Sequence, residues 1–394
     1  LFDTVLLMKL QLLIFSFALT FLSCKRNLLP SVPEQLNHHN HKVFEENKLP
    51  PRATFFGFEN KLKPDKENSR RFLSLNGDWK FNFVKDPRLR PSTFQNVKFD
   101  DSDWDTIQVP ANWEVEGYDH PIYLDERYPF DAQWPNVPKD YNPVGTYRKE
   151  VWLAHEFLTE DVILHFGGAK SAMYVYVNGQ YVGYSQGSKT PAEFDITQHL
   201  KVGKNIIALQ LFRWSDASYL ESQDMLRMSG IEREVYLYTR PKVFITDFYA
   251  YTNLDDTYNH GIFRDTVFLQ NNSKELAQRS LRIELFDGKE IVYRSEEKIQ
   301  IPPSSKINFQ TEKVVENVKK WSAELPNLYQ LIISLEDSEN SNNNQFVKRN
   351  IGFKRVEVKN SQVLINGKPI YIRGVNRHET DPLTGHVVSR ASME

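Results

Sequence analysis

The sequence has a single cysteine, Cys24, in 394 residues, so no disulfide can form within the chain. It also lacks an excess of either charge, because 49 lysines and arginines face 51 aspartates and glutamates for a net charge of −2. This balance does not indicate a nucleic-acid-binding face. With 40% hydrophobic and 25% charged residues, the composition is typical of globular proteins and not of disordered or fibrous ones. The length indicates about two or three domains.

The surroundings of Cys24 resemble a bacterial lipoprotein signal. A short basic start precedes the apolar run Leu10–Leu22, and the small Ser23 stands before the cysteine. The run has the length of a signal peptide and is short for a membrane span. We therefore expect a signal over residues 1–24, lipidation of Cys24, and export to the periplasm or to an outer-membrane anchor in a bacterium. Phe21 stands where leucine is usual, which leaves plain secretory cleavage open.

Residues 49–240 show short alternating runs between turn residues, a pattern typical of antiparallel strands. In the clearest run, Val175 and Val177 alternate with tyrosines, and Asn178-Gly179 follows with the signature of a type I′ hairpin turn. The pattern predicts a jelly-roll sandwich. The preceding residues, 25–48, are polar. Their histidines lack further ligands at defined spacing, so a solvated linker is favoured over a metal site.

A second β unit is predicted over residues 241–355. Leu281, Ile283 and Leu285 alternate with polar residues, and the polar stretch Ser338–Gln345 fits a connecting loop. About a hundred residues with several short strands fit an immunoglobulin-like sandwich, and the lack of cysteine here excludes the antibody-type disulfide.

The third segment, 356–394, begins with a predicted hairpin at Asn366-Gly367. A strand is expected at Tyr371–Val375, and the start of a helix at Ala391–Glu394. Between them lies a polar turn that holds Arg377, His378, Glu379 and Asp381. A strand, a polar turn and an incipient helix are typical of the start of a (β/α)₈ barrel, in which functional residues follow the strands.

Four longer motifs occur in a fixed order along the chain. They are PANWEVEGYDHPIY (Pro110–Tyr123), RWSDASYLESQDMLRMSGIEREVYL (Arg213–Leu237), WSAELPNLY (Trp321–Tyr329) and NGKPIYIRGVNRHETDP (Asn366–Pro382). With these motifs the chain resembles the amino-terminal part of the bacterial β-galactosidases of glycoside hydrolase family 2, over about residues 45 to 394.

The resemblance implies a jelly-roll sugar-binding domain, an immunoglobulin-like domain and the start of a catalytic barrel. It also implies retaining hydrolysis of terminal β-galactose from β-galactosides, with one glutamate as acid and another as nucleophile. Neither glutamate has a counterpart in this sequence, so we expect an amino-terminal fragment that is inactive alone. A non-catalytic carbohydrate-binding or interaction module remains an alternative, as does a β-glucuronidase or β-mannosidase relative. The Arg213–Leu237 motif and Arg377 favour the galactosidases.

Three substrate-binding residues follow from the resemblance. Asn112 matches a family asparagine that bonds sugar hydroxyls, a role that suits an amide because it both donates and accepts. Asp224 matches an aspartate that contacts galactose and a sodium ion, for which carboxylate oxygen is a suitable hard ligand. His378 matches a histidine of the galactose subsite, where imidazole can donate to a hydroxyl.

The surroundings of these residues depart from the family pattern at three positions. Ser222 and Leu226 replace the aspartate and tryptophan that are frequent around Asp224, and Thr380 replaces a frequent histidine. For the intact enzyme the resemblance implies sodium and magnesium as cofactors, a β-galactoside as substrate and a homo-oligomeric state. This chain would supply at most one sodium ligand, through Asp224.

Overall fold

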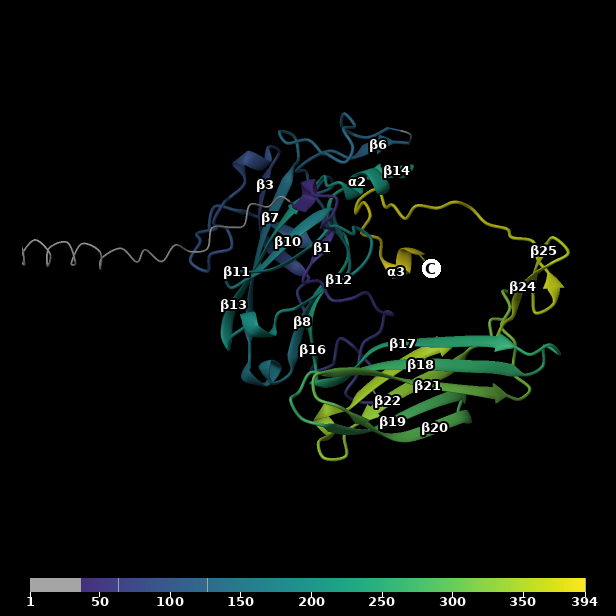
Figure 1. The fold of residues 1–394 in the computed structure, drawn as a ribbon. Coiled ribbons are helices and arrows are strands. Elements are labelled where there is room, and N and C mark those ends of the chain that lie inside the picture. The colour runs from purple at the N-terminus through teal and green to yellow at the C-terminus, as the bar shows by residue number, and fades with distance from the viewer. Residues whose placement is uncertain (1–36, 63, 126, 394) are drawn as a thin grey trace, which may run out of the picture. The chain divides into compact units, whose positions relative to one another are not determined.

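The protein is described by a computed structural model that covers residues 37–62, 64–125 and 127–393. Over this part of the chain, antiparallel strands form two sandwiches in succession and then a small three-stranded sheet (Figure 1). The predicted fold class, mainly β with a jelly-roll unit before an immunoglobulin-like one, is confirmed. The predicted signal and Cys24 lie outside the described residues. The solvated linker predicted over residues 25–48 is wrong for its described part, because Glu45–Glu46 pair with a strand of the first sandwich and His38 is buried against Phe212. Among the described residues, none of the helices has the length and apolar content needed to cross a bilayer.

The first sandwich consists of a large sheet, a smaller facing sheet and two short accessory sheets. The large sheet has the order β1 (Glu45–Glu46), β11 (Gln180–Ser185), β10 (Ala172–Val177), β13 (Gly203–Phe212), β7 (Val144–Leu153), β3 (Gly77–Val84) and β4 (Asp105–Val109). The facing sheet has the order β12 (Ala192–Asp195), β8 (Asp161–Phe166), β16 (Val235–Arg240) and β2 (Phe72–Ser74). The accessory sheets are β14 (Met225–Arg227) with β6 (Ile122–Leu124), and β5 (Ala111–Asn112) with β15 (Gly230–Ile231) and β9 (Ala169–Lys170).

The alternating residues of these strands build the first core. Val175 and Val177 of β10 pack with Leu209 of β13 in one buried cluster between the sheets. The predicted hairpin is confirmed, because Val177 pairs with Gln180 across the Asn178-Gly179 turn. Both turn residues have the positive φ that a type I′ turn requires, 50° and 85°.

The second sandwich has a separate core and longer strands. One sheet has the order β17 (Val243–Leu254), β18 (Gly261–Asn271) and β21 (Ser305–Val315). The other has the order β20 (Glu290–Ile301), β19 (Ala277–Asp287), β22 (Tyr329–Glu336) and β23 (Gln345–Ile351). The predicted alternation of Leu281, Ile283 and Leu285 on β19 places all three in this core.

Helices are short throughout the described residues. The α-helices are α2 (Ala217–Leu220) and α3 (Arg390–Met393). The 3₁₀ turns are η1 (Asn37–His39), η2 (Pro87–Leu89), η3 (His155–Thr159), η4 (Thr197–His199) and η5 (Ser341–Asn343).

Buried arginine contacts connect the first sandwich to the second. Arg71, fully buried, donates to the carbonyls of Asn342 (2.6 Å) and Asn344 (2.9 Å) in the second sandwich and pairs with Glu160 of the first. The segment before β2 also reaches the second sandwich, since Phe58 forms a β-bridge with Phe346.

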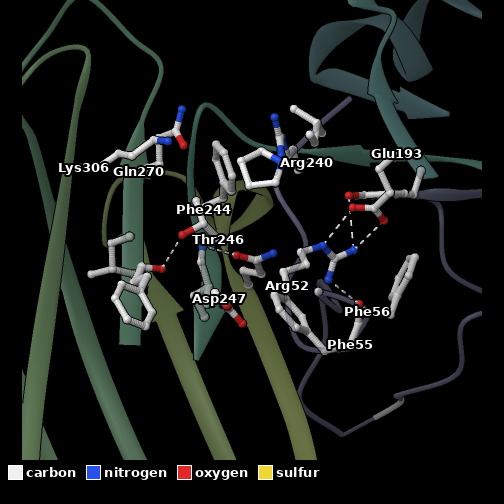
Figure 2. Close-up of a pocket in the computed structure, with 18 of the residues that line it drawn as sticks. Arg52, Phe55, Phe56, Glu193, Arg240, Phe244, Thr246, Asp247, Gln270 and Lys306 are labelled. Carbon is white, nitrogen blue, oxygen red and sulfur yellow. Dashed lines mark hydrogen bonds and ion pairs between the residues drawn. The ribbon is translucent and has the colours of Figure 1, made fainter. Parts of the chain in front are cut away.

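Arg52 lies beside a cavity of about 330 Å³, where residues 49–57 pass between the two sandwiches (Figure 2). All five of its guanidinium N–H groups have partners: Glu193 twice, Tyr238, and the carbonyls of Ala53 and Phe55. A guanidinium satisfied in this way has no donor left for a ligand. We interpret this cavity as structural, and none of the three predicted sugar-binding residues lines it.

The last segment forms β24 (Val356–Lys359), β25 (Gln362–Ile365) and β26 (Lys368–Pro369), with the predicted turn at Asn366-Gly367. The strand predicted at Tyr371–Val375 is not formed, because residues 370–380 have no regular structure and Tyr371 is 92% exposed. A parallel barrel strand needs neighbours on both sides for its backbone groups, and the described residues provide none there. The predicted helix start is confirmed by α3.

Glu193 tests how strongly the Arg52 contact stabilises the first sandwich. Burial alone would raise the pKa of Glu193, but the His165 hydrogen bond and the Arg52 charge hold it at about 2, below its ordinary 4.5. Its contribution to stability is therefore complete above pH 4.5 and is lost as the pH falls towards 2. We expect Glu193→Gln to lower the free energy of unfolding by about 3 kcal/mol at neutral pH, measured by denaturant titration.

A matched control is Glu234→Gln, which breaks the half-exposed pair with Lys66 and should cost at most about 1 kcal/mol. Equal unfolding free energies for the wild-type and Glu193→Gln chains at neutral pH would contradict the assignment.

Candidate functional site

Arg213 organises the surface that carries the predicted site, and it opens the Arg213–Leu237 motif. Its guanidinium is fully buried and pairs with the Asp119 carboxylate. It also donates to the carbonyls of His120 at 3.1 Å and Arg227 at 3.3 Å. One buried cation thus joins the loop that leads to β6 with strand β14. The β6–β14 pairing, in which Leu226 lies opposite Tyr123, continues this connection.

A second carboxylate, that of Glu114, lies 3.4 Å from Arg213. Burial raises the pKa of Glu114 to about 7, against the opposing charge of Arg213 and a hydrogen bond from the Ser229 N–H. A carboxyl with such a pKa changes its charge near neutral pH. The electrostatics under the site therefore depend on pH in the physiological range.

Asp224 is placed at the edge of this surface, just before β14. It is exposed, and the Tyr123 hydroxyl donates a hydrogen bond to one of its oxygens. The rest of the carboxylate faces solvent and can accept hydrogen bonds from sugar hydroxyls. Among the described residues no group of three or more histidine, cysteine, aspartate or glutamate side chains could hold a metal ion. Asp224 is therefore not part of such a cluster among the described residues.

Asn112 is fully buried, and its amide is occupied by protein groups. Its Nδ2 donates to the Ser229 carbonyl at 3.0 Å and to Glu232 Oε1 at 3.2 Å. Its Oδ1 accepts a hydrogen bond from the His386 backbone N–H at 2.7 Å. Gly385 makes this approach possible, since a Cβ there would lie 2.6 Å from Asn112 Oδ1, and its φ is +64°. In this structure Asn112 positions the 385–386 turn.

Glu232 forms the centre of a buried charged network beneath that turn. Its Oε1 lies 2.9 Å from His386 Nδ1, and its Oε2 pairs with Lys189. Burial would raise the pKa of Glu232, but the His386 hydrogen bond and the Lys189 charge outweigh it and hold the pKa at about 2. Glu232 is therefore ionised across the physiological range. It attaches the 385–386 turn of the third segment to the first sandwich.

His378 lies in the exposed stretch 370–380, and its ring forms no hydrogen bond with another described residue. The described contacts do not join it to Asn112 or Asp224. Of the three predicted residues, one is buried in a network and two face solvent.

Sequence reasoning missed the residues that position the site: Arg213, Glu232 and His386. A signal was present for the first two, because each is a charged residue next to apolar residues of the motif, in "LFRW" and "SGIERE". Charged residues in such positions are rarely buried unless they are paired. His386 gave no comparable signal, since its partner Glu232 is 154 residues away.

Comparison with known families identifies three consecutive matches. The glycosyl hydrolases family 2 sugar binding domain matches residues 72–241, a second model, described as glycosyl hydrolases family 2, matches residues 243–354, and the family's TIM barrel domain matches residues 356–394. The chain belongs to glycosyl hydrolases family 2. The β5, β6 and β14 surface lies within the part matched by the sugar binding domain.

Curated relatives within family 2 include β-galactosidases. The one from Photobacterium profundum is 42% identical over 329 residues, which cover 81% of this chain and 31% of that protein. The one from Priestia megaterium is 37% identical over 374 residues, covering 90% and 35%. The chain spans about a third of the length of these relatives. A solved Bacteroides uniformis β-glucuronidase, 21% identical, shares the fold with a TM-score of 0.69 over 81% of this chain and 36% of that one.

Asn112→Ala tests the positioning role of the asparagine. The change removes three hydrogen bonds and leaves the His386 N–H and the Ser229 carbonyl without this partner. We expect a cost of about 1–3 kcal/mol that is concentrated in the turn. Amide hydrogen exchange of residues 381–389 should therefore accelerate at least about tenfold.

The control is Asn142→Ala. Asn142 is equally buried, but its side chain bonds Trp214 and makes no hydrogen bond to the 385–386 turn. This change should lower the free energy of global unfolding without selectively accelerating amide hydrogen exchange in residues 381–389. The same exchange profile in both variants would refute the positioning role.

Proposed function

We propose that this chain is the amino-terminal part of a retaining β-galactosidase that removes terminal β-galactose from β-galactosides. The observation that carries the proposal is the 42% identity to a Photobacterium profundum β-galactosidase over 81% of this chain. The resemblance to β-glucuronidases is a likeness of fold at 21% identity. It therefore supports the glucuronidase alternative less strongly.

In the proposed mechanism, the first sandwich contributes binding and not bond cleavage. Asp224 would accept hydrogen bonds from galactose hydroxyls, and its exposed carboxylate supports that role. His378 would donate to the same sugar once barrel strands order residues 370–380. Asn112 would act mainly by holding the 385–386 turn, since its donors and its acceptor are engaged by protein. The two glutamates that protonate the leaving oxygen and attack the anomeric carbon would come from a complete family barrel.

Sodium and magnesium as cofactors and a homo-oligomeric assembly belong to the same proposal. For sodium, Asp224 would supply one ligand, with the others from outside the described residues.

The proposal is tested in a protein that carries this chain joined to a complete family barrel. We expect release of nitrophenol from nitrophenyl β-galactoside and much slower release from the β-glucuronide. Asp224→Ala and His378→Ala should each lower kcat/KM about a hundredfold, the effect of losing one hydrogen bond to a developing charge in a desolvated site. Glu312→Ala, which removes an exposed acid of β21 paired with Arg264, serves as the control and should leave kcat/KM unchanged. A preference for the glucuronide would overturn the assignment.

We also propose that Cys24 is lipidated and anchors the exported chain to a membrane. The support is the apolar run Leu10–Leu22 with Ser23 before the cysteine. In a Gram-negative host the wild-type chain should sediment with membranes, and Cys24→Ala should release it or leave it unprocessed. Recovery of both forms in the soluble periplasmic fraction would favour plain secretory cleavage.

A further inference from the structure

Trp134 is an exposed tryptophan that the proposed function does not use. It lies in a turn closed by a bridge between Gln133 and Asn136, and 59% of its surface is exposed. Among the described residues, its indole N–H has no hydrogen-bond partner. Burying the indole ring would stabilise the fold, so its exposure indicates a role other than core packing.

The indole is held in a fixed orientation from below. One of its faces stacks on Tyr219, with ring centroids 4.1 Å apart and planes 27° apart. Tyr128 contacts it edge to face at 5.1 Å. The Tyr219 hydroxyl also fixes the turn, because it accepts from the Gln133 N–H at 3.1 Å and donates to the Asn136 carbonyl at 2.5 Å. The ring is therefore oriented before any ligand arrives.

The same small core supports Trp134 and Asp224. Val137, Trp214 and Tyr219 form a buried cluster, and Ile122 of β6 packs against it. β6 pairs with β14, and Tyr123 of β6 bonds Asp224. The labels of β6, β14 and α2, the helix of Tyr219, lie together in Figure 1. The elements that carry Asp224 and Trp134 are thus both supported by this small core.

The chemistry around the indole fits a sugar. The exposed residues beside it in the turn include the polar Asp131 and Gln133, whose planar groups can bond hydroxyls. A pyranose ring presents an apolar C–H face for stacking and hydroxyls at its rim.

We propose that the free face of Trp134 is a stacking platform for a pyranose ring, so that this surface of the first sandwich binds a saccharide. The proposal deepens the proposed function, on which it rests for the identity of the sugar, a β-galactoside. On that basis the platform would hold the second sugar of a substrate whose galactose lies at Asp224.

The experiment uses the 394-residue chain labelled with 5-fluorotryptophan and titrated with lactose, followed by ¹⁹F NMR. Trp152 is the matched control, since it is 71% exposed on β7 and its indole N–H already donates to Glu150 at 3.1 Å. The two resonances are assigned with Trp134→Phe and Trp152→Phe. We expect a saturable shift of the Trp134 resonance and none of the Trp152 resonance. Isothermal titration calorimetry with lactose should give a Kd several-fold higher for Tyr219→Phe, which frees the turn, and about tenfold higher for Trp134→Ala.

No saturable shift at Trp134, or equal shifts at both tryptophans, would overturn the platform. An unchanged Kd in Trp134→Ala would do so as well. This outcome is separate from that of the proposed function, because the titration measures binding without hydrolysis. Saccharide binding at Trp134 in a protein that does not hydrolyse galactosides would keep the platform and reject the enzyme assignment.

Discussion

A guanidinium that is taken out of water needs a counter-charge and hydrogen-bond acceptors, and the site surface is built around one that has both. Arg213 has the Asp119 carboxylate beside it and donates to carbonyls from two separate segments. Those segments are the loop before β6 and the strand β14. Loss of these acceptors would leave a buried charge unpaired, at a large cost in free energy. The loop that leads to Tyr123 and the strand that follows Asp224 are therefore held together. The position of the exposed carboxylate thus depends on an interaction beneath it.

Buried networks position the turn and the loop, while the side chains that we propose to bind a ligand remain in solvent. Asn112, Glu232 and His386 bond one another, so protein groups occupy the Asn112 amide and Glu232 Oε1. Asp224 and Trp134 are the opposite case, with supported backbones and exposed functional groups. Such an arrangement reduces the ordering that a ligand must impose on the protein when it binds.

Features that are determined by neighbouring residues could be predicted from the sequence, whereas features that depend on distant segments could not. The hairpin at Asn178-Gly179 follows from two adjacent residues that accept positive φ, and it was predicted correctly. The strand at Tyr371–Val375 has the correct local pattern but lacks partners, so pattern alone misled. Asn112 was singled out by its motif, whereas its engagement by His386 depends on a segment far along the chain. A sequence read one segment at a time does not reveal such a pairing.

The bridge between Phe58 and Phe346 bears on the order of events during synthesis. The strands of the first sandwich are all present once Arg240 has left the ribosome, but residue 58 and the guanidinium of Arg71 must wait for the loop after β22 and for β23. At about 5–20 residues per second, that interval lasts roughly 5 to 20 seconds. During this interval the Arg71 guanidinium and the backbone of Phe58 lack their partners in the second sandwich. Both are then accessible to other chains. We expect the nascent chain to be most prone to association with other chains during this interval.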